Sequence, residues 1–180
     1  FEAVLRPDAE AAIHALKRQG FAVEIISGDH AAPVESLARA LNLPAQARVT
    51  PGNKADHIAR RSAAGGKVLM VGDGLNDAPA LRTAHASMAP ASAADVGRNA
   101  ADFVFLRDSL LAVPEAIETA RRAAALVRQN MALAIVYNII AVPIAIAGFV
   151  TPLIAAVAMS LSSILVVANA LRIGGGKART

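Results

Sequence analysis

The chain has 180 residues, of which 55% are hydrophobic and 18% are charged, and its formal net charge is +4. It contains no Cys, which excludes a disulfide scaffold and any thiolate metal site within these residues. The positive charge does not indicate nucleic-acid binding, because residues 1–128 are nearly neutral and only 3% of the chain is aromatic. The excess of basic residues comes from Arg172, Lys177 and Arg179, at the end of the chain.

The first 114 residues alternate between helical and strand-like patterns. Helices are predicted at Pro7–Gln19, Pro33–Leu41, Asn53–Ala64 and Ala93–Asn99, and strands at Ala22–Ile26, Lys67–Val71, Ala86–Ala89 and Phe103–Leu106. This order is typical of an α/β domain with a parallel sheet and helices on its faces. Ligands of such domains bind at the carboxyl ends of the strands.

A helical pattern at Glu115–Arg128 leads directly into a long apolar segment. No Asp, Glu, Lys or Arg occurs from Gln129 to Leu171. As a helix rising about 1.5 Å per residue, residues 131–150 would cross roughly 30 Å of hydrocarbon, and Leu153–Ile173 is long enough for a second crossing. We therefore expect a transmembrane hairpin; two buried helices of a large soluble protein are the less favoured alternative.

Further features of the hairpin follow from single residues. The turn is expected near Gly148–Pro152, and Pro143 should kink the first span. Basic residues flank the hairpin on both sides, so the positive-inside rule places both flanks in the cytoplasm. The predicted organisation is an α/β part at 1–114, a stalk helix at 115–130, two transmembrane helices at 131–173 and a cytoplasmic tail at 174–180.

Two loops that follow predicted strands combine glycines with acidic and amide side chains. Their members are Ser27, Gly28 and Asp29 in the first loop, and Gly72, Asp73, Gly74, Asn76 and Asp77 in the second. Asp73 and Asp77 can hold a hard cation such as Mg²⁺, and Asn76 can donate to a phosphoryl oxygen. Gly72 and Gly74 let the backbone approach an anion closely. Either loop alone would more often be a tight turn without a ligand.

Lys54 completes a set of groups suited to phosphoryl transfer. It lies at the start of a predicted helix, where an isolated Lys is usually a solvated surface charge. Beside the two loops, its ammonium group would neutralise a transferring phosphoryl group and keep a neighbouring carboxylate ionised. Ser27, Lys54 and the acidic pair then supply every part of a phosphoryl-aspartate site except the nucleophile.

The run VGDGLNDAPAL at Val71–Leu81 resembles the C-terminal portion of P-type ATPases, whose phosphorylation domain belongs to the haloacid dehalogenase-like superfamily. In this resemblance Ser27, Gly28 and Asp29 correspond to the family's Thr-Gly-Asp loop, with Ser27 in place of Thr. Lys54 corresponds to the lysine at the phosphate, and Asp73 to the Mg²⁺ ligand. Asn76 and Asp77 correspond to residues that complete the phosphate and Mg²⁺ shell. The resemblance implies ATP and Mg²⁺ as cofactors.

The chain departs from the family in one respect. The family's nucleophile is the Asp of an Asp-Lys-Thr-Gly motif, and none of the Asp residues here is followed two positions later by Asp or Thr. We therefore expect a fragment that is inactive alone. The nucleophile, the actuator and nucleotide-binding domains and the other membrane helices are then expected as partners within the same, longer ATPase chain.

Polar residues in the predicted spans indicate the transported ion. Met159 and Ser163 are four positions apart and share a helix face, and a thioether is a soft ligand that suits Cu(I). The spans resemble the last two helices of copper-transporting P1B-type ATPases, in which Tyr137, Asn138, Met159 and Ser163 would be ligands of the transported Cu(I). Zinc-transporting relatives carry a Lys and an Asp there, and neither occurs here. For Ser160, Ser162 and Asn169 we expect ordinary interhelical hydrogen bonding and small-residue packing.

The resemblance extends to a bacterial subgroup. Ser87–Leu110 is similar to ATPases that deliver copper for assembly of cbb3-type cytochrome oxidase, which implies an inner-membrane location, a cytoplasmic α/β part and copper chaperones as partners. Three alternatives remain: a membrane-anchored phosphatase of the same superfamily, a P-type ATPase for Zn or Cd, and a non-catalytic partner subunit. The four His residues show no ligand spacing and are interpreted as surface or hydrogen-bonded polar residues.

Overall fold

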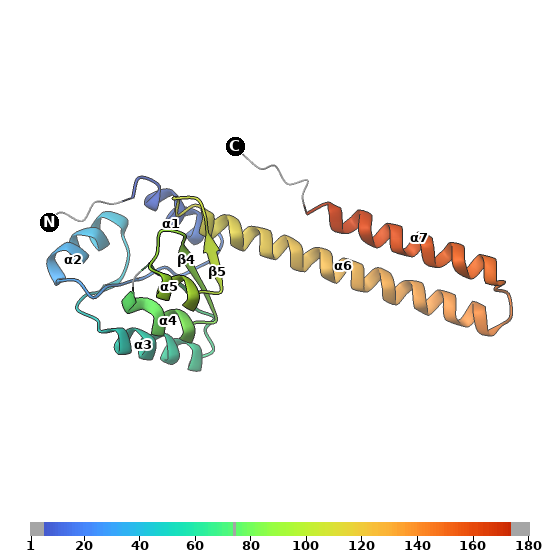
Figure 1. Ribbon diagram of the computed structural model, residues 1–180, viewed down its shortest axis with the longest axis horizontal. Helices are drawn as coiled ribbons and strands as arrows, with labels where there is room; N and C mark the ends of the chain where they lie inside the picture. The colour runs from blue at the N-terminus through green and yellow to red at the C-terminus, as the bar shows by residue number, and fades with distance from the viewer. Residues whose placement is uncertain (1–5, 74, 174–180) are drawn as a thin grey trace. The chain divides into compact units, whose positions relative to one another are not determined.

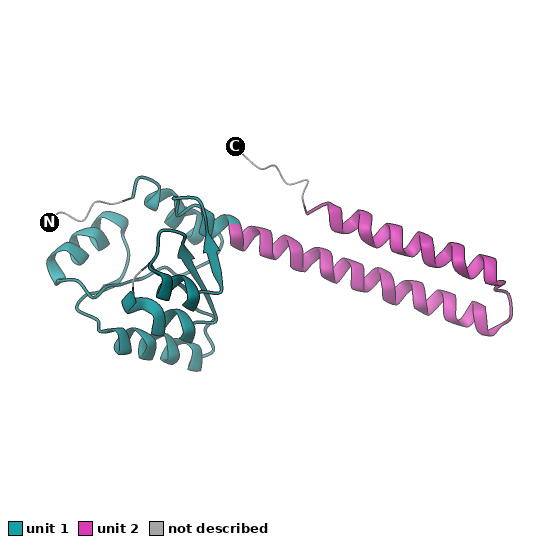
Figure 2. Cartoon of the chain, in the orientation of Figure 1, with its two compact units in different colours: residues 1–115 teal, residues 116–180 magenta. Residues whose placement is uncertain are grey.

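The computed structural model describes residues 6–73 and 75–173. The chain divides into two compact units, residues 1–115 and residues 116–180 (Figure 2). Gly74, which we predicted to approach an anion, and the predicted tail at 174–180 lie outside the described residues.

The first unit is an α/β domain, as predicted (Figure 1). Its helices are α1 (Ala9–Arg18), α2 (Ala31–Leu41), α3 (Pro51–Ala63), α4 (Ala78–Thr83) and α5 (Asp95–Ala100), with a short 3-10 helix η1 (Leu75–Asp77) before α4. Its strands are β1 (Ile25–Ile26), β2 (Ala45–Gln46), β3 (Leu69–Val71), β4 (Ala86–Pro90) and β5 (Phe103–Phe105).

The strands pair in parallel, as predicted, but they form two sheets among the described residues. One sheet has the order β1-β2 and the other the order β3-β4-β5. Ser27 follows β1 directly and Gly72 follows β3 directly, so both candidate loops lie at carboxyl ends of strands. This is the edge at which ligands of parallel sheets bind.

Helix α3 begins at Pro51, earlier than the predicted Asn53, because a cap precedes it. The backbone N–H of Asn53 donates to Oγ1 of Thr50 at 3.3 Å, and Pro51 occupies the first helical position. Proline is favoured there because its missing N–H would have no partner in the helix. This cap places Lys54 in the first turn of α3.

The core of the first unit lies between its helices and the larger sheet. Helices α3 and α4 lie side by side (Figure 1), and Ile58 of α3 and Leu81 of α4 are almost completely buried. Ser87 in β4 is also buried, and its backbone N–H and hydroxyl both donate to Oδ2 of Asp102 at 2.8 and 3.0 Å. Because buried polar groups need partners, this contact satisfies Ser87 and ties the start of β5 to β4.

The second unit is a helical hairpin. Helix α6 (Ala112–Ile146) begins in the first unit and continues as the first arm, and α7 (Pro152–Leu171) is the second arm. Both helices are long and apolar enough to cross a membrane. The predicted stalk and first span are thus parts of one helix. It ends at Ile146 rather than at residue 150, and Gly148 in the following turn has a left-handed φ of 79°.

Amide side chains join the two arms of the hairpin. Nδ2 of Asn169 donates to Oδ1 of Asn130 at 2.9 Å, and Nδ2 of Asn130 donates to the carbonyl of Val166 at 3.4 Å. The interhelical role expected of Asn169 is therefore confirmed. The Ser160 hydroxyl instead donates to the Ala156 carbonyl of its own helix at 2.9 Å. The small-residue packing expected of Ser160 and Ser162 stays a prediction. The kink at Pro143, which lies inside α6, stays a prediction.

Candidate active site

The two candidate loops and the start of α3 surround one cavity of about 470 Å³. It is lined by Ser27, Gly28, Asp29, Arg48, Val49, Thr50, Pro51, Lys54, Asp73, Asn76 and Asp77. Seven of these residues were expected from the sequence to share a site, and the fold brings all seven together. Arg48 and Thr50 were missed, because a two-residue strand such as β2 leaves no readable pattern before them.

A buried ion pair occupies one side of the cavity. Nζ of Lys54 lies 2.7 Å from Oδ1 of Asp77, and the side chains of these residues are only 9% and 13% exposed. A buried ammonium group requires such a partner, since desolvating an unpaired charge is very costly. Lys54 thus engages Oδ1 of Asp77, and among residues 6–73 and 75–173 no hydrogen bond reaches Oδ2, which could bind a cation or a further donor.

Gly72 is required by the close approach of Asp77. A Cβ atom at Gly72 would lie 2.9 Å from both Cβ and Oδ2 of Asp77, a distance that real Cβ atoms essentially never show. The sequence interpretation assigned Gly72 to the approach of an anion. The structure adds a different reason for this glycine, namely the space that the Asp77 side chain needs to reach Lys54.

The loop after β1 is held in shape by its own side chains. The hydroxyl of Ser27 donates to Oδ2 of Asp29 at 3.0 Å, and the backbone N–H of Asp29 donates back to the Ser27 hydroxyl at 3.1 Å. A hydroxyl has a single proton, so Ser27 must rotate away from Asp29 before it can donate to a phosphoryl oxygen.

Two backbone hydrogen bonds join this loop to the segment before α3. The N–H of Arg48 donates to the Asp29 carbonyl at 2.9 Å, and the N–H of Val49 donates to the Ser27 carbonyl at 3.0 Å. They do not follow the parallel register of β1 and β2, because the partner number falls from Asp29 to Ser27 as the donor moves from Arg48 to Val49. The candidate loop and the start of the Lys54 helix are therefore held together by main-chain contacts.

The oxygen donors of the second loop fit Mg²⁺. Asp73, Asn76 and Asp77 offer carboxylate and amide oxygens, the ligand type that Mg²⁺ prefers. Within residues 6–73 and 75–173 no group of three or more His, Cys, Asp or Glu side chains could hold a metal ion alone. This agrees with magnesium sites that use one or two carboxylates, with substrate phosphates and waters completing the shell.

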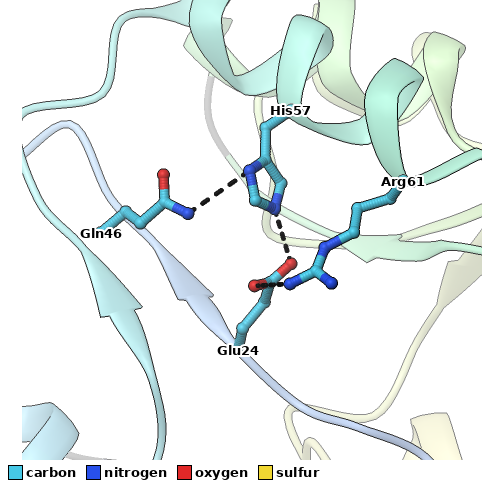
Figure 3. A network of polar contacts seen from close by, with 4 residues as sticks. All are labelled: Glu24, Gln46, His57 and Arg61. Atoms are coloured by element: carbon cyan, nitrogen blue, oxygen red, sulfur yellow. Dashed lines mark hydrogen bonds and ion pairs between the residues drawn. The ribbon is translucent and has the colours of Figure 1, made fainter. Parts of the chain in front are cut away.

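A network of polar side chains joins Glu24, Gln46, His57 and Arg61 (Figure 3). Nε2 of His57 and Oε1 of Glu24 are 2.7 Å apart, an Arg61 nitrogen donates to Oε2 of Glu24 at 3.0 Å, and Nε2 of Gln46 lies 3.3 Å from Nδ1 of His57. Burial raises the pKa of Glu24, but the hydrogen bonds and positive charges of His57 and Arg61 outweigh it and lower that pKa below its ordinary value.

The same network links three elements that carry the site. Glu24 precedes β1, Gln46 belongs to β2, and His57 and Arg61 belong to α3. The expectation that His57 is a hydrogen-bonded polar residue is confirmed. Sequence analysis missed the network as a whole, because nothing in the spacing of Glu24 and His57 along the chain shows that they meet.

The predicted Cu(I) ligands lie on the two arms of the hairpin. On α6, Nδ2 of Asn138 donates to the Ala134 carbonyl at 2.8 Å; on α7, the Ser163 hydroxyl donates to the Met159 carbonyl at 3.0 Å. The Asn138 amide group and the Ser163 hydroxyl thus each donate within their own helix. Lone pairs of their oxygen atoms could still coordinate an ion. Among the described residues, no hydrogen bond joins Tyr137 or Asn138 to Met159 or Ser163.

Comparison with known proteins identifies the family. Residues 2–85 match the haloacid dehalogenase-like hydrolases. The chain is 58% identical, over 97% of its length, to nitrogen fixation protein FixI of Rhizobium leguminosarum bv. viciae, and covers 23% of that protein. It is 39% identical, over 94% of its length, to a copper-exporting P-type ATPase of Staphylococcus epidermidis, and covers 21% of it.

A solved structure shows the same fold for nearly the whole chain. The crystal structure of a zinc-transporting PIB-type ATPase in its E2.Pi state superposes with a TM-score of 0.89 and 32% identity, covering 96% of this chain and 28% of that one. The first unit is therefore a haloacid dehalogenase-like domain, followed by two apolar helices. The chain as a whole is homologous to the C-terminal part of P1B-type ATPases, as the sequence motifs implied. It spans less than a quarter of FixI and of the copper-exporting ATPase.

Proposed function

We propose that this chain is the C-terminal part of an ATP-driven membrane pump that transports Cu(I) through an aspartyl-phosphate intermediate. The observation that carries the proposal is the meeting of Ser27, Lys54 and Asp73 at one cavity, in a chain homologous to P-type ATPases. These residue types, placed at the carboxyl ends of parallel strands, are suited to binding and stabilising a transferring phosphoryl group.

Each residue of the cavity has a proposed role. Asp73 and Oδ2 of Asp77 would hold Mg²⁺, which when bound offsets the negative charge of the phosphates. Lys54 supplies positive charge beside them and orients the Asp77 carboxylate through their 2.7 Å contact. Asn76 and, after rotation, Ser27 donate to phosphoryl oxygens. Gly28 lines the cavity, whereas Gly72 is not among its lining residues and would act by leaving space for the Asp77 side chain.

The nucleophilic carboxylate is proposed to come from another segment of the complete protein. The sheets β1-β2 and β3-β4-β5 are separate, yet both are parallel and both carry candidate loops at their carboxyl ends. A further parallel strand that joined them would end beside Ser27, Lys54 and Asp73. An Asp at the end of that strand could receive the phosphoryl group from ATP.

Cu(I) is the proposed cargo. Met159 offers a soft thioether, and Tyr137, Asn138 and Ser163 offer neutral oxygens. A hard divalent ion would favour an acidic ligand, and the chain has none from Gln129 to Leu171. The similarity to a copper-exporting ATPase supports this choice, whereas the similar solved structure is that of a zinc transporter.

The proposed location is the bacterial inner membrane, with the first unit in the cytoplasm. The basic residues on both flanks of the hairpin support this orientation. The similarity to FixI proteins over nearly the whole chain supports the subgroup that supplies copper to cbb3-type cytochrome oxidase, with a copper chaperone as the donor of the ion.

The proposal is tested by ATP hydrolysis of the complete protein in detergent or lipid. We expect Cu(I), presented with a thiol, to stimulate hydrolysis well above the metal-free rate, and Zn(II) to leave it near that rate. Stimulation by Zn(II) alone would overturn the assignment of copper. Hydrolysis that responds to neither ion, in a protein that is monodisperse and folded, would overturn the assignment as a metal pump.

A further inference from the structure

The charges that line the cavity do not balance. Three carboxylates, those of Asp29, Asp73 and Asp77, face two cationic residues, Lys54 and Arg48. Lys54 is already paired with Asp77 at 2.7 Å. Arg48 is exposed, and its guanidinium makes no hydrogen bond or ion pair within the part of the chain that the structure describes. It is therefore the cation of the cavity lining that remains available to a ligand.

The backbone of Arg48 is held in an uncommon conformation. Its φ is 55°, and among the described residues only Asn42 and Arg48 have a positive φ without being glycine. Asn42 ends α2, a common place for a left-handed residue. Arg48 instead precedes α3 and lies beside the candidate loop. Hydrogen bonds from its own N–H to Asp29 and from Val49 to Ser27 fix it there.

Such a position suits glycine, yet it carries a long cationic side chain. A left-handed backbone at a residue other than glycine is uncommon and is often found at functional sites. A guanidinium group presents several N–H donors in a plane and binds phosphate through two hydrogen bonds at once. A phosphate that enters the cavity also meets the carboxylates of Asp29 and Asp73, so a free cation nearby offsets their repulsion.

We infer that Arg48 binds phosphate oxygens of the ligand in this cavity. The inference rests on the proposed function, because it names a contact to the phosphate that the pump would take from ATP. That phosphate has two sources with the same chemistry: the phosphate chain of bound MgATP, and the phosphoryl group after its transfer, which inorganic phosphate also delivers. An exposed surface charge without a ligand is the competing interpretation.

The experiment uses the complete protein and three substitutions of Arg48. Arg48→Ala removes the guanidinium group but keeps a Cβ atom, which is unfavourable at a positive φ. Arg48→Gly removes the guanidinium group and the Cβ atom, and glycine adopts a positive φ readily. Arg48→Lys keeps the charge without the planar fork. Arg60→Ala is the matched control, because Arg60 is an exposed arginine of α3 that does not line the cavity. Thermal unfolding verifies that each variant is folded.

Two readouts separate the sources of the phosphate. The first is the MgATP concentration that gives half-maximal phosphoenzyme, and the second is the same quantity for inorganic phosphate with Mg²⁺. We expect Arg48→Ala and Arg48→Gly to raise the first concentration by about tenfold or more, Arg48→Lys to raise it less, and Arg60→Ala to leave it within about twofold. If only the half-maximal MgATP concentration rises, Arg48 contacts the phosphate chain of the bound nucleotide. If the half-maximal concentrations of MgATP and of inorganic phosphate both rise, Arg48 contacts the transferred phosphoryl group.

Other results overturn the inference. If Arg48→Ala and Arg48→Gly match the wild type in both readouts, Arg48 does not contact the phosphate. If Arg48→Ala is impaired while Arg48→Gly matches the wild type, the backbone conformation and not the guanidinium is what matters. If the folded wild-type protein forms no phosphoenzyme from either source, the proposed function itself is wrong, and the contact inferred for Arg48 is wrong with it.

Discussion

Asp77 shows how closely single residues determine this site. One of its carboxylate oxygens receives a hydrogen bond from Lys54, and the other lies within 2.9 Å of the place where a Cβ at Gly72 would be. The side chain is thus confined between an ammonium group and a glycine. Its position depends on both neighbours, although they are far from each other in the sequence.

Replacing Gly72 with Ala is expected to displace Asp77 and disturb both the ion pair and the proposed Mg²⁺ shell. We predict a loss of phosphoenzyme of about tenfold or more at fixed Mg²⁺, because misplacing a group at a reacting centre is costly. The matched control is Gly52→Ala, since a Cβ at Gly52 would meet nothing within 4 Å. Equal phosphoenzyme levels in the two variants would show that the confinement of Asp77 is unimportant.

The carboxyl group of Glu24 should make the stability of the folded chain depend on pH. Its pKa is lower in the folded chain than the ordinary value of 4.5, because the hydrogen bonds and charges of His57 and Arg61 outweigh the opposite effect of burial. The folded state therefore binds fewer protons than the unfolded state. The stability contributed by Glu24 is fully present above its ordinary pKa and is lost as the pH falls through the lowered pKa.

We therefore expect Glu24→Gln to destabilise the chain at about pH 6 and to have a smaller effect near about pH 3, measured by chemical unfolding at each pH. Glu35→Gln, which changes an exposed carboxyl group of α2, is the control and should change the free energy of unfolding by less than about 0.5 kcal/mol. A destabilisation by Glu24→Gln that does not vary with pH would contradict the assignment.

Helix α6 is the element that belongs to both units. It begins at Ala112, among the buried residues of the first unit, where the Gln19 side chain donates to the Pro114 carbonyl at 3.1 Å. It continues to Ile146 and carries Tyr137 and Asn138. Because packed helices move as stiff bodies, we propose that α6 transmits movement linked to phosphorylation toward the predicted Cu(I) ligands.

Glycine at both Ala124 and Ala125 should weaken this helix, since each glycine in a helix interior costs about 1 kcal/mol relative to alanine. In the complete pump we expect ATP hydrolysis to persist while Cu(I) transport per ATP falls. Gln at the same two positions keeps a good helix former and is the control. Transport at normal stoichiometry in the double-glycine variant would count against coupling through α6.

At the scale of elements, sequence patterns predicted the long helices well and the short strands less well. A long apolar run without charges suffices to predict the membrane-capable parts of α6 and α7, because crossing a membrane requires about 20 such residues. The residues of β2 form a strand only because β1 lies beside them, so no local pattern marks Ala45–Gln46. Helix α4 was not predicted, because no element was assigned between the loop that ends at Asp77 and the strand at Ala86–Ala89.

Sequence analysis could predict those residues of the candidate site that lie in a loop directly after a strand. Ser27 and Asp73 follow β1 and β3, and the general rule for parallel sheets predicts that each loop lies at the ligand-binding end of its strand. That the loops of two separate sheets share one cavity is a finding of the structure. The partners of side chains were not predictable in the same way. Which oxygen of Asp77 meets Lys54, and whether Ser27 donates to Asp29, depend on distances that only the folded chain defines.

At the scale of the whole molecule, an α/β unit is followed in the chain by a pair of membrane-capable helices. The homology to P1B-type ATPases holds for both parts, since the similar solved structure covers 96% of the chain. We propose that, in the complete protein, the chemistry at the cavity drives the movement of Cu(I), which a transport assay tests directly.

The most direct measurement is ATP-dependent uptake of Cu(I) into inside-out membrane vesicles that contain the complete protein. We predict uptake by the wild type, a loss of at least about tenfold in Asp73→Asn, and nearly normal uptake in Asp56→Asn, which changes an exposed carboxyl group of α3 outside the cavity. Undiminished uptake by Asp73→Asn, or no uptake of Cu(I) by the folded wild type, would contradict the account.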